Sequence, residues 1–168
     1  MLVVGIDPGT ATTGYGFIHE TPEGGLQAVD YGVIQTPTGL SPAERLALIY
    51  DKLNELLLLH HPVSGAVEKL FFQRNVTTAI AVGQARGVVL LALAQKKLPV
   101  AEYTPLEVKQ AVAGYGGADK NQVQQMVKAL LGLKEIPRPD DAADALAVAI
   151  CHIHSYPLST AGTIQNPD

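Results

Sequence analysis

An uninterrupted apolar segment stands at the start of the chain. Residues 2–6 contain only apolar residues and glycine, and Asp7, Pro8 and Gly9 follow directly. A run without polar alternation predicts a strand that is buried on both faces, and the Pro-Gly pair predicts that it ends in a turn. Asp7 is therefore expected at the carboxyl end of a central strand, where open α/β sheets bind ligands. The alternative is a turn aspartate that hydrogen-bonds its own backbone.

Four later segments have the apolar and aromatic content of strands. Residues 13–19 and 26–36 are separated by the turn-forming segment 21–25, so the first three strands are expected to form an antiparallel meander. Two further strands are expected at 63–70 and 98–103.

Capping residues and apolar residues at helical spacing mark the helices. Ser41, Thr104 and Asp119 are each followed three residues later by Glu or Gln, which is the capping-box pattern at the start of a helix. With the apolar spacing, these signals predict five helices. They are expected from Pro42 to before Pro62, over 76–97, from Pro105 through Val112, from after Asp119 through Leu131, and from Asp140 to about His154.

The order of these elements indicates an α/β fold. Three antiparallel strands followed by alternating helices and strands predict a mixed five-stranded sheet with helices on both faces. With 168 residues and 47% hydrophobic content, the chain is long enough to bury a core. We expect a single domain over residues 1–156, followed by a disordered tail, 157–168, that is rich in small and polar residues.

Composition narrows the class of protein. The chain has no tryptophan and few aromatic residues, so Ala, Val, Leu and Ile must build the core. Cys151 is the only cysteine, which excludes an internal disulfide and a cysteine-based zinc site and fits a reducing compartment. The longest apolar runs, such as 87–94, are too short to span a bilayer, and the N-terminus lacks the basic start of a signal peptide. We therefore expect a cytoplasmic protein without a membrane partner.

Charge is distributed unevenly along the chain. The net charge of −4 divides into −6 for residues 1–68, +6 for 69–139 and −4 for 140–168. A basic middle between acidic ends predicts a phosphate-binding face beside a cluster of carboxylates, whereas a mixed solvated surface is the alternative.

The last predicted helix begins with a group of acids. Asp141 and Asp144 are three residues apart and project from the helical face that also carries Ala145 and Val148. Like charges on an apolar face are unfavourable unless a positive group, such as a metal ion, offsets their repulsion and desolvation. The alternative is that these acids favour the helix N-terminus, with Asp140 as the N-cap. That alternative explains Asp144 less well, because it lies about one turn further in.

A fourth carboxylate, Glu68, lies in an otherwise apolar predicted strand. Oxygen ligands without clustered cysteine or paired histidine suit Mg²⁺ or Mn²⁺. Two such ions can activate water and stabilise the leaving oxygen of a phosphoryl displacement. The set therefore suggests phosphodiester hydrolysis, with the four acids Asp7, Glu68, Asp141 and Asp144 as candidates.

Five motifs make the chain resemble the RuvC family of Holliday-junction resolvases. They are GIDPG at 5–9, the strand that carries Glu68, GQARG at 83–87, VKQ at 108–110 and DAADALA at 141–147. The resemblance covers about residues 1–155 and implies a ribonuclease-H-like fold and a homodimer. It also implies Mg²⁺-dependent, paired nicking of two strands of like polarity at a four-way DNA junction during recombination and repair. The expected products carry a 5′-phosphate and a 3′-hydroxyl.

The resemblance also assigns roles to residues. Lys109 and Lys120 match the family's basic residues near the scissile phosphate and the DNA backbone, although exposed solubilising charge is the alternative. The four acids match metal-binding catalytic residues, which implies two Mg²⁺ per subunit, with Mn²⁺ as a substitute: Asp7, Glu68, Asp141 and Asp144.

The segment after Glu68 matches the part of the family that contacts the junction. Phe71 stands where the family has an aromatic residue that probes the junction centre, and stacking on a base needs an exposed ring. The neighbouring Phe72 is the other candidate for this role, and Arg74 is a candidate for DNA contact. The alternative for Phe71 is a core position at the end of the strand.

The predicted helix over 76–97 carries a stripe of small residues. Ala79, Gly83 and Gly87 recur every four residues, a spacing that lets another backbone approach closely. The resemblance identifies this helix as the family's dimer helix, whereas the alternative is packing on the sheet of the same chain. The resemblance further implies a branch-migration motor and a junction-binding protein, of the RuvA–RuvB type, as partners.

Two other functional classes share single features with this chain. Actin-like sugar kinases and ATPases also place a strand before Asp-x-Gly-Thr, here residues 7–10, but they need a second, duplicated lobe that 168 residues cannot supply. A purely structural junction-binding protein would share the basic middle, but it would gain nothing from four converging acids.

Overall fold

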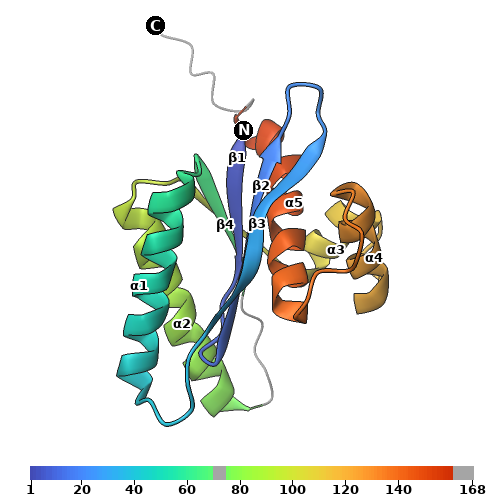
Figure 1. Cartoon of the computed structure of the whole chain (residues 1–168). Helices are drawn as coiled ribbons and strands as arrows, with labels where there is room; N and C mark the ends of the chain where they lie inside the picture. The colour runs from blue at the N-terminus through green and yellow to red at the C-terminus, as the bar shows by residue number, and fades with distance from the viewer. Residues whose placement is uncertain (70–74, 161–168) are drawn as a thin grey trace, which may run out of the picture.

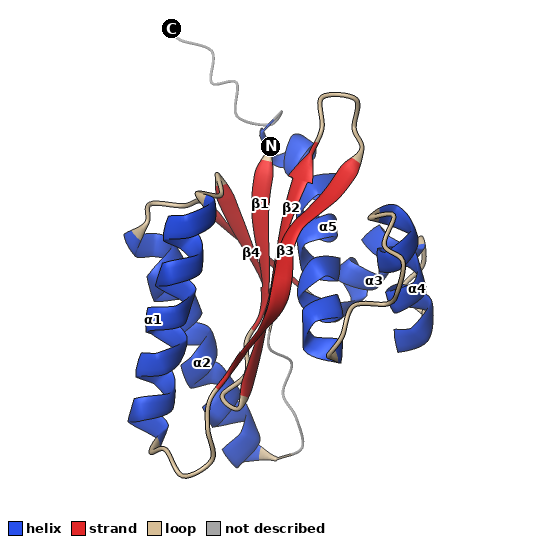
Figure 2. Cartoon of the chain, in the orientation of Figure 1, coloured by secondary structure: helices blue, strands red, loops and turns tan. Residues whose placement is uncertain are grey.

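The chain folds into a five-stranded sheet with helices on both faces (Figures 1 and 2). The computed structural model describes residues 1–69 and 75–160, of which 157–160 are described as backbone only. The strands are β1 (Leu2–Asp7), β2 (Thr12–Glu20), β3 (Leu26–Gln35), β4 (Ser64–Glu68) and β5 (Val100–Tyr103). The helices are α1 (Pro42–His60), α2 (Val76–Gln95), α3 (Pro105–Ala113), α4 (Lys120–Leu130) and α5 (Asp140–Thr160).

Strand β1 lies at the centre of the sheet, whose order is β3-β2-β1-β4-β5. It pairs antiparallel with β2 and parallel with β4, and β4 pairs parallel with β5. The predicted meander and the predicted mixed sheet are thus confirmed. Because β1, β4 and β5 run in the same direction, their carboxyl ends meet at one edge of the sheet, the lower edge in Figure 1.

Capping residues start three of the helices as the sequence predicts. The side chains of Ser41, Thr104 and Asp119 each accept a hydrogen bond from the backbone N–H three residues later, and Glu44, Glu107 and Gln122 complete the three capping boxes. These contacts satisfy backbone donors that have no partner within the helix, so local sequence determines where each helix begins.

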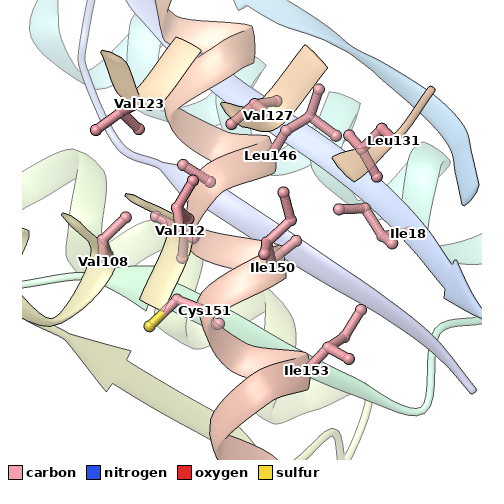
Figure 3. Packing of buried hydrophobic residues seen from close by; sticks show 14 of the residues in the cluster. Ile18, Val108, Val112, Val123, Val127, Leu131, Leu146, Ile150, Cys151 and Ile153 are labelled. Atoms are coloured by element: carbon pink, nitrogen blue, oxygen red, sulfur yellow. The ribbon is translucent and has the colours of Figure 1, made fainter. Parts of the chain in front are cut away.

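The two faces of the sheet carry different helices. Helices α1 and α2 cover one face, and α5 covers the other, with α3 and α4 packed on its outer side (Figure 1). Figure 3 shows Ile150 of α5 with Ile18 of β2 on one side and Val112 of α3 on the other. Helix α5 is therefore buried between the sheet and a second layer of helices.

Helix α5 lies almost directly on the backbone of β1 and β2. A Cβ atom added at Gly5 would lie 2.2 Å from the carbonyl oxygen of Ala145, and one added at Gly14 would lie 2.0 Å from that of Asp141. Side chains essentially never approach backbone atoms this closely. Glycine at these two positions is therefore a condition for the position of α5.

A buried polar group lies near the other end of α5. His152 is 2% exposed, and its ring nitrogens lie 2.9 Å from the hydroxyl oxygens of Ser64 and Tyr103. Burial lowers the pKa of His152 to about 4, so the ring is neutral at pH 7. A neutral imidazole has one donor and one acceptor, and each can pair with a hydroxyl.

The end of α5 differs from the sequence prediction. The helix was expected to end near His154, before Pro157, but it continues to Thr160. A proline removes a single helical hydrogen bond, and here the helix continues past it. The predicted disordered tail thus includes four helical residues, 157–160, and its remainder, 161–168, lies outside the described residues. The domain limits at 1–156 stay a prediction.

We expect Gly5→Ala to lower the free energy of unfolding by about 1–3 kcal/mol, since the new methyl group must push α5 from the sheet. Gly117→Ala is the matched control, because a Cβ there meets its nearest atom, in the Tyr115 ring, at an ordinary 3.5 Å. Urea denaturation measures both variants. Equal stability of the two would contradict the close packing of α5.

Candidate active site

Asp7 and Glu68 lie side by side at the edge where β1 and β4 end. Ile6 of β1 pairs with Val67 of β4, so the two acids occupy the next position on each strand. Asp7 follows Gly5 by two residues, and Glu68 follows Ala66 by two, which places both side chains on the α5 face. The two carboxyl groups are close enough for each to shift the pKa of the other.

Asp141 and Asp144 reach the same edge from the first turns of α5. Carboxylate oxygens of Asp7, Asp141 and Asp144 lie within 4.8 Å of one another, and all three residues are half-buried. The structure thus brings together the carboxylates that the sequence predicts, with Glu68 next to Asp7. Hard oxygen donors at this spacing fit a divalent cation such as Mg²⁺ or Mn²⁺.

Gly14 determines this juxtaposition, and sequence reasoning missed it. Gly14 pairs with Asp7 across β1 and β2, and the backbone oxygen of Asp141 occupies the space that a side chain at Gly14 would need. The first turn of α5 can therefore lie beside Asp7. A glycine inside a strand, here between Thr13 and Tyr15, is the available sequence signal for such a close backbone approach.

Burial and mutual repulsion make these carboxylates unusual acids. Desolvation by burial, with the charges of Glu68, Asp144 and Asp141, raises the pKa of Asp7 to about 8. Desolvation also raises the pKa of Glu68 and of Asp144, with smaller effects from neighbouring charges. The nearby cationic side chains do not offset the desolvation and repulsion of these carboxylates, so a bound cation would stabilise their ionised form.

Two lysines border the acids. Lys109 of α3 and Lys120 of α4 line one open pocket together with Glu68 and Asp144. The Lys120 Nζ lies 3.6 Å from a carboxylate oxygen of Asp144 and 3.2 Å from one of Asp140. Partial burial disfavours the charged ammonium, but the two carboxylates outweigh this effect and raise the pKa of Lys120. Both predicted lysines are thus at the site.

Helix α5 begins at Asp140, as predicted, so the alternative in which Asp140 is the N-cap does not hold. Asp140 is the first helical residue, and its carboxylate accepts hydrogen bonds from Gln124 Nε2 and Arg138 Nη1, at 3.2 and 3.0 Å, besides its contact with Lys120. Three donors lie within its reach, and their hydrogen bonds and charges lower the pKa of Asp140. Asp140 therefore holds Lys120 beside the acids, a role that the sequence did not indicate.

The remaining predicted contacts have different outcomes. Phe71, Phe72 and Arg74 lie outside the described residues. Ala79 and Gly83 are half-buried on α2, and Gly87 is exposed, with open space around a Cβ added there.

The outward face of α2 is apolar. The residues that α2 buries against the rest of the protein are Ala85, Val89, Ala92 and Leu93, whereas Val76, Ile80 and Leu91 are exposed. By length and composition alone, α2 is apolar enough to cross a membrane, although its uninterrupted apolar runs are too short to do so. Only 22% of its most apolar part is buried, so among the described residues much of the apolar surface of α2 is exposed or only half-buried.

Comparisons with known proteins agree with this geometry. The family model described as crossover junction endodeoxyribonuclease RuvC matches residues 3–152. A protein of that name from Desulfitobacterium hafniense (strain DSM 10664 / DCB-2) is 62% identical over 158 residues, which are 94% of this chain and 95% of the relative. Another, from Roseiflexus sp. (strain RS-1), is 60% identical over 155 residues, 92% of each chain.

A solved structure has the same arrangement of sheet and helices. T. thermophilus RuvC in complex with Holliday junction substrate superposes with a TM-score of 0.87 at 37% identity, over 95% of this chain and 98% of that one. The mixed sheet is therefore ribonuclease-H-like, as the resemblance implied. With its acids gathered at the ends of β1, β4 and α5, the chain belongs to the RuvC family of crossover junction endodeoxyribonucleases.

Proposed function

We propose that this nuclease resolves Holliday junctions by paired, symmetric hydrolysis of one phosphodiester bond in each of two strands of like polarity. The observation that carries the proposal is the convergence of Asp7, Glu68, Asp141 and Asp144 at one edge of the sheet, in a chain of this family. The products carry a 5′-phosphate and a 3′-hydroxyl, which can be ligated, and the process serves recombination and repair.

The cofactor in this proposal is Mg²⁺, two ions per subunit, with Mn²⁺ as a substitute. When bound, the ions supply activation of water and stabilisation of the leaving oxygen. Asp7, Glu68, Asp141 and Asp144 hold the ions, and Gly14 keeps two of these side chains within reach of each other. The raised pKa of Asp7 means that its carboxylate gains more from a divalent cation than a solvated carboxylate does.

The lysines act on the nucleic acid. DNA carries a dense negative charge, which the cluster of acids repels, so cationic side chains must bring the backbone to the site. Lys109 and Lys120 lie on the α3 and α4 side of the pocket, next to Glu68 and Asp144. In this proposal they contact the DNA backbone near the scissile phosphate. Phe71 or Phe72 stacks on a base at the junction centre, and Arg74 contacts the backbone.

We further propose that a second copy of the chain covers α2. Val76, Ile80, Gly87 and Leu91 follow one face of the helix at helical spacing, and this face is exposed. An apolar stripe with a glycine near its middle suits close packing of two identical helices. A homodimer places two active sites in one particle, which paired nicking of two strands requires.

Two other parts of the proposal rest on family resemblance and composition. A branch-migration motor and a junction-binding protein of the RuvA–RuvB type are the proposed partners. The proposed location is the cytoplasm, which suits a protein whose one cysteine, Cys151, is buried and unpaired.

The proposal predicts symmetric nicks in a four-way DNA junction with a mobile core, and none in a linear duplex of the same sequence. Nicking should need Mg²⁺ and stop in EDTA, as denaturing gels of end-labelled strands would show. Cutting of both substrates would remove the junction specificity from the proposal. Junction binding without nicking at saturating Mg²⁺ would favour a purely structural role.

Asp7→Asn removes one charge from the cluster of acids and keeps the size of the side chain. In EDTA the raised pKa of Asp7 means that the folded protein binds more protons than the unfolded chain between pH 4 and 8, so stability falls as pH rises through this range. At pH 8 we expect the variant to be more stable than the original protein by on the order of 2 kcal/mol. Nicking should be lost while junction binding remains, because phosphate contacts carry the binding.

Asp51→Asn is the control, since Asp51 is an exposed acid on α1. Mg²⁺ at 100 times its dissociation constant should stabilise the original protein by about 2.7 kcal/mol and Asp7→Asn by much less. Urea denaturation over a pH series, with and without Mg²⁺, measures these effects. If Mg²⁺ stabilised the original protein and Asp7→Asn equally, the proposed role of Asp7 as a metal ligand would be refuted.

Ile80→Glu, on the outward face of α2, is expected to give a folded monomer that binds Mg²⁺ but no longer makes paired nicks. Leu59→Glu on α1 is the matched control, because both residues are exposed large apolar residues, at 58% and 70%. Light scattering after size exclusion measures the mass. A dimeric Ile80→Glu would mean that α2 is not the interface, and a monomeric Leu59→Glu would mean that the loss of the dimer is not specific to α2.

A further inference from the structure

We propose that Arg86 is a positioning residue that fixes the end of the Glu68 strand and thereby sets the place of the Glu68 carboxylate. The residue belongs to the GQARG motif, and the proposed function gives no role to its arginine. The inference rests on the proposed function in one respect, namely that Glu68 is a metal ligand.

Arg86 reaches the site edge from the opposite side of the sheet. It lies in α2, which covers the face away from α5, and its side chain is only 16% exposed. Its Nη1 donates a hydrogen bond of 2.8 Å to the backbone carbonyl oxygen of Glu68. Its Nη2 forms an ion pair with the carboxylate of Glu102 on β5.

One guanidinium thus joins two neighbouring strands. Val67 and Glu68 of β4 pair with Glu102 and Tyr103 of β5, so the two groups that Arg86 binds lie on adjacent strands at the same level of the sheet. The planar fork of a guanidinium can serve two acceptors at a defined separation, which the single ammonium of lysine cannot do equally well. The ends of β4 and β5 are therefore held in one geometry.

Arg86 contacts β4 at the last residue of the strand. Glu68 is the last residue of the strand, and the bond from the Lys69 N–H to the carbonyl oxygen of Tyr103, at 2.7 Å, directly follows it. A strand end has fewer neighbours than a strand centre and moves more easily. Arg86 supplies a further bond at the residue whose side chain must remain in place.

Arg86 acts on the backbone of Glu68 and leaves its carboxylate free. The charges with the main influence on the Glu68 carboxyl group are those of Asp144, Lys109 and Lys120, and Arg86 is not among them. Repulsion from Asp144 favours movement of the Glu68 side chain away from the cluster, and a fixed backbone limits that movement. The function of Arg86 is thus geometric.

The ion pair with Glu102 stabilises the charge of Arg86 at its buried position. Burial lowers the pKa of Arg86, which shows the cost of desolvating its charge, and the ion pair offsets this cost. The side chain of Glu102 lies on the α2 face, because its partner in the pairing, Val67, belongs to the core that α1 and α2 cover. Glu102 is therefore separate from the acids of the active site.

The test compares Arg86→Gln and Arg86→Lys with a control arginine. Arg45 also joins a helix to the sheet region on this face, since its Nη1 donates a 3.0 Å hydrogen bond to Thr36 Oγ1. Arg45→Gln therefore measures the effect of losing an arginine that only stabilises the fold. Three quantities are measured for each variant: the melting temperature, the Mn²⁺ affinity without DNA by electron paramagnetic resonance, and the dependence of nicking on Mg²⁺ concentration.

We expect both Arg86 variants to bind Mn²⁺ about tenfold or more weakly, the size of effect seen when a residue that orients a metal ligand is removed. Nicking should decrease at low Mg²⁺ and recover at high Mg²⁺, with unchanged junction binding in EDTA. Arg45→Gln should lower the melting temperature without changing the Mn²⁺ affinity. Arg86→Lys keeps the positive charge, so it gives a folded variant for the test if Arg86→Gln does not fold.

Glu68→Gln separates failure of this inference from failure of the proposed function. If Glu68→Gln loses Mn²⁺ binding while the Arg86 variants bind as Arg45→Gln does, Arg86 is only a structural tie and the inference is overturned. If Glu68→Gln itself binds Mn²⁺ normally and nicks junctions, the proposed role of Glu68 is wrong, and the inference is overturned together with it.

Discussion

The contact between helix α5 and the backbone of β1 and β2 is the constraint on which the site depends. Without side chains at Gly5 and Gly14, the helix lies so close to the sheet that its first turns meet the end of the central strand. Asp141 and Asp144 then share a small volume with Asp7, although more than 130 residues separate them along the chain. The other elements serve this arrangement, because α3 and α4 cover the outer side of α5 and bring the two lysines to the pocket.

Without a bound cation, the clustering of these carboxylates destabilises the folded protein. Half-buried carboxylates raise one another's pKa, and Lys120, shared between Asp140 and Asp144, compensates only part of the charge. The fold offsets this repulsion with apolar burial along the rest of α5, from Ala145 to Ile153, where every side chain is buried. Stability and cation binding are thus coupled, because the buried carboxylates that favour a metal ion also weaken the metal-free fold.

The sequence predicted those features that depend on neighbouring residues. Capping boxes at Ser41, Thr104 and Asp119 placed helix starts, and the run before Asp7 identified the central strand. It did not predict pairings between distant residues, such as Arg86 with Glu102 or Asp140 with Lys120, because these depend on which strands and helices become neighbours. The outward face of α2 was also hard to predict, since an apolar helix has the same pattern whether its own chain or a second copy covers it.

The buried histidine of α5 has a consequence for the acids at its other end. Helix α5 is held against the sheet by apolar packing of residues such as Leu146 and Ile150, which has no directional preference of its own. Hydrogen bonds are directional, and those between the His152 ring and the hydroxyl groups of Ser64 and Tyr103 restrict rotation of the helix about its axis. His152 lies eleven residues after Asp141, about three full turns, so it projects from nearly the same side. The hydrogen bonds of His152 near one end of the helix thus help to orient the carboxylate of Asp141 at the other end.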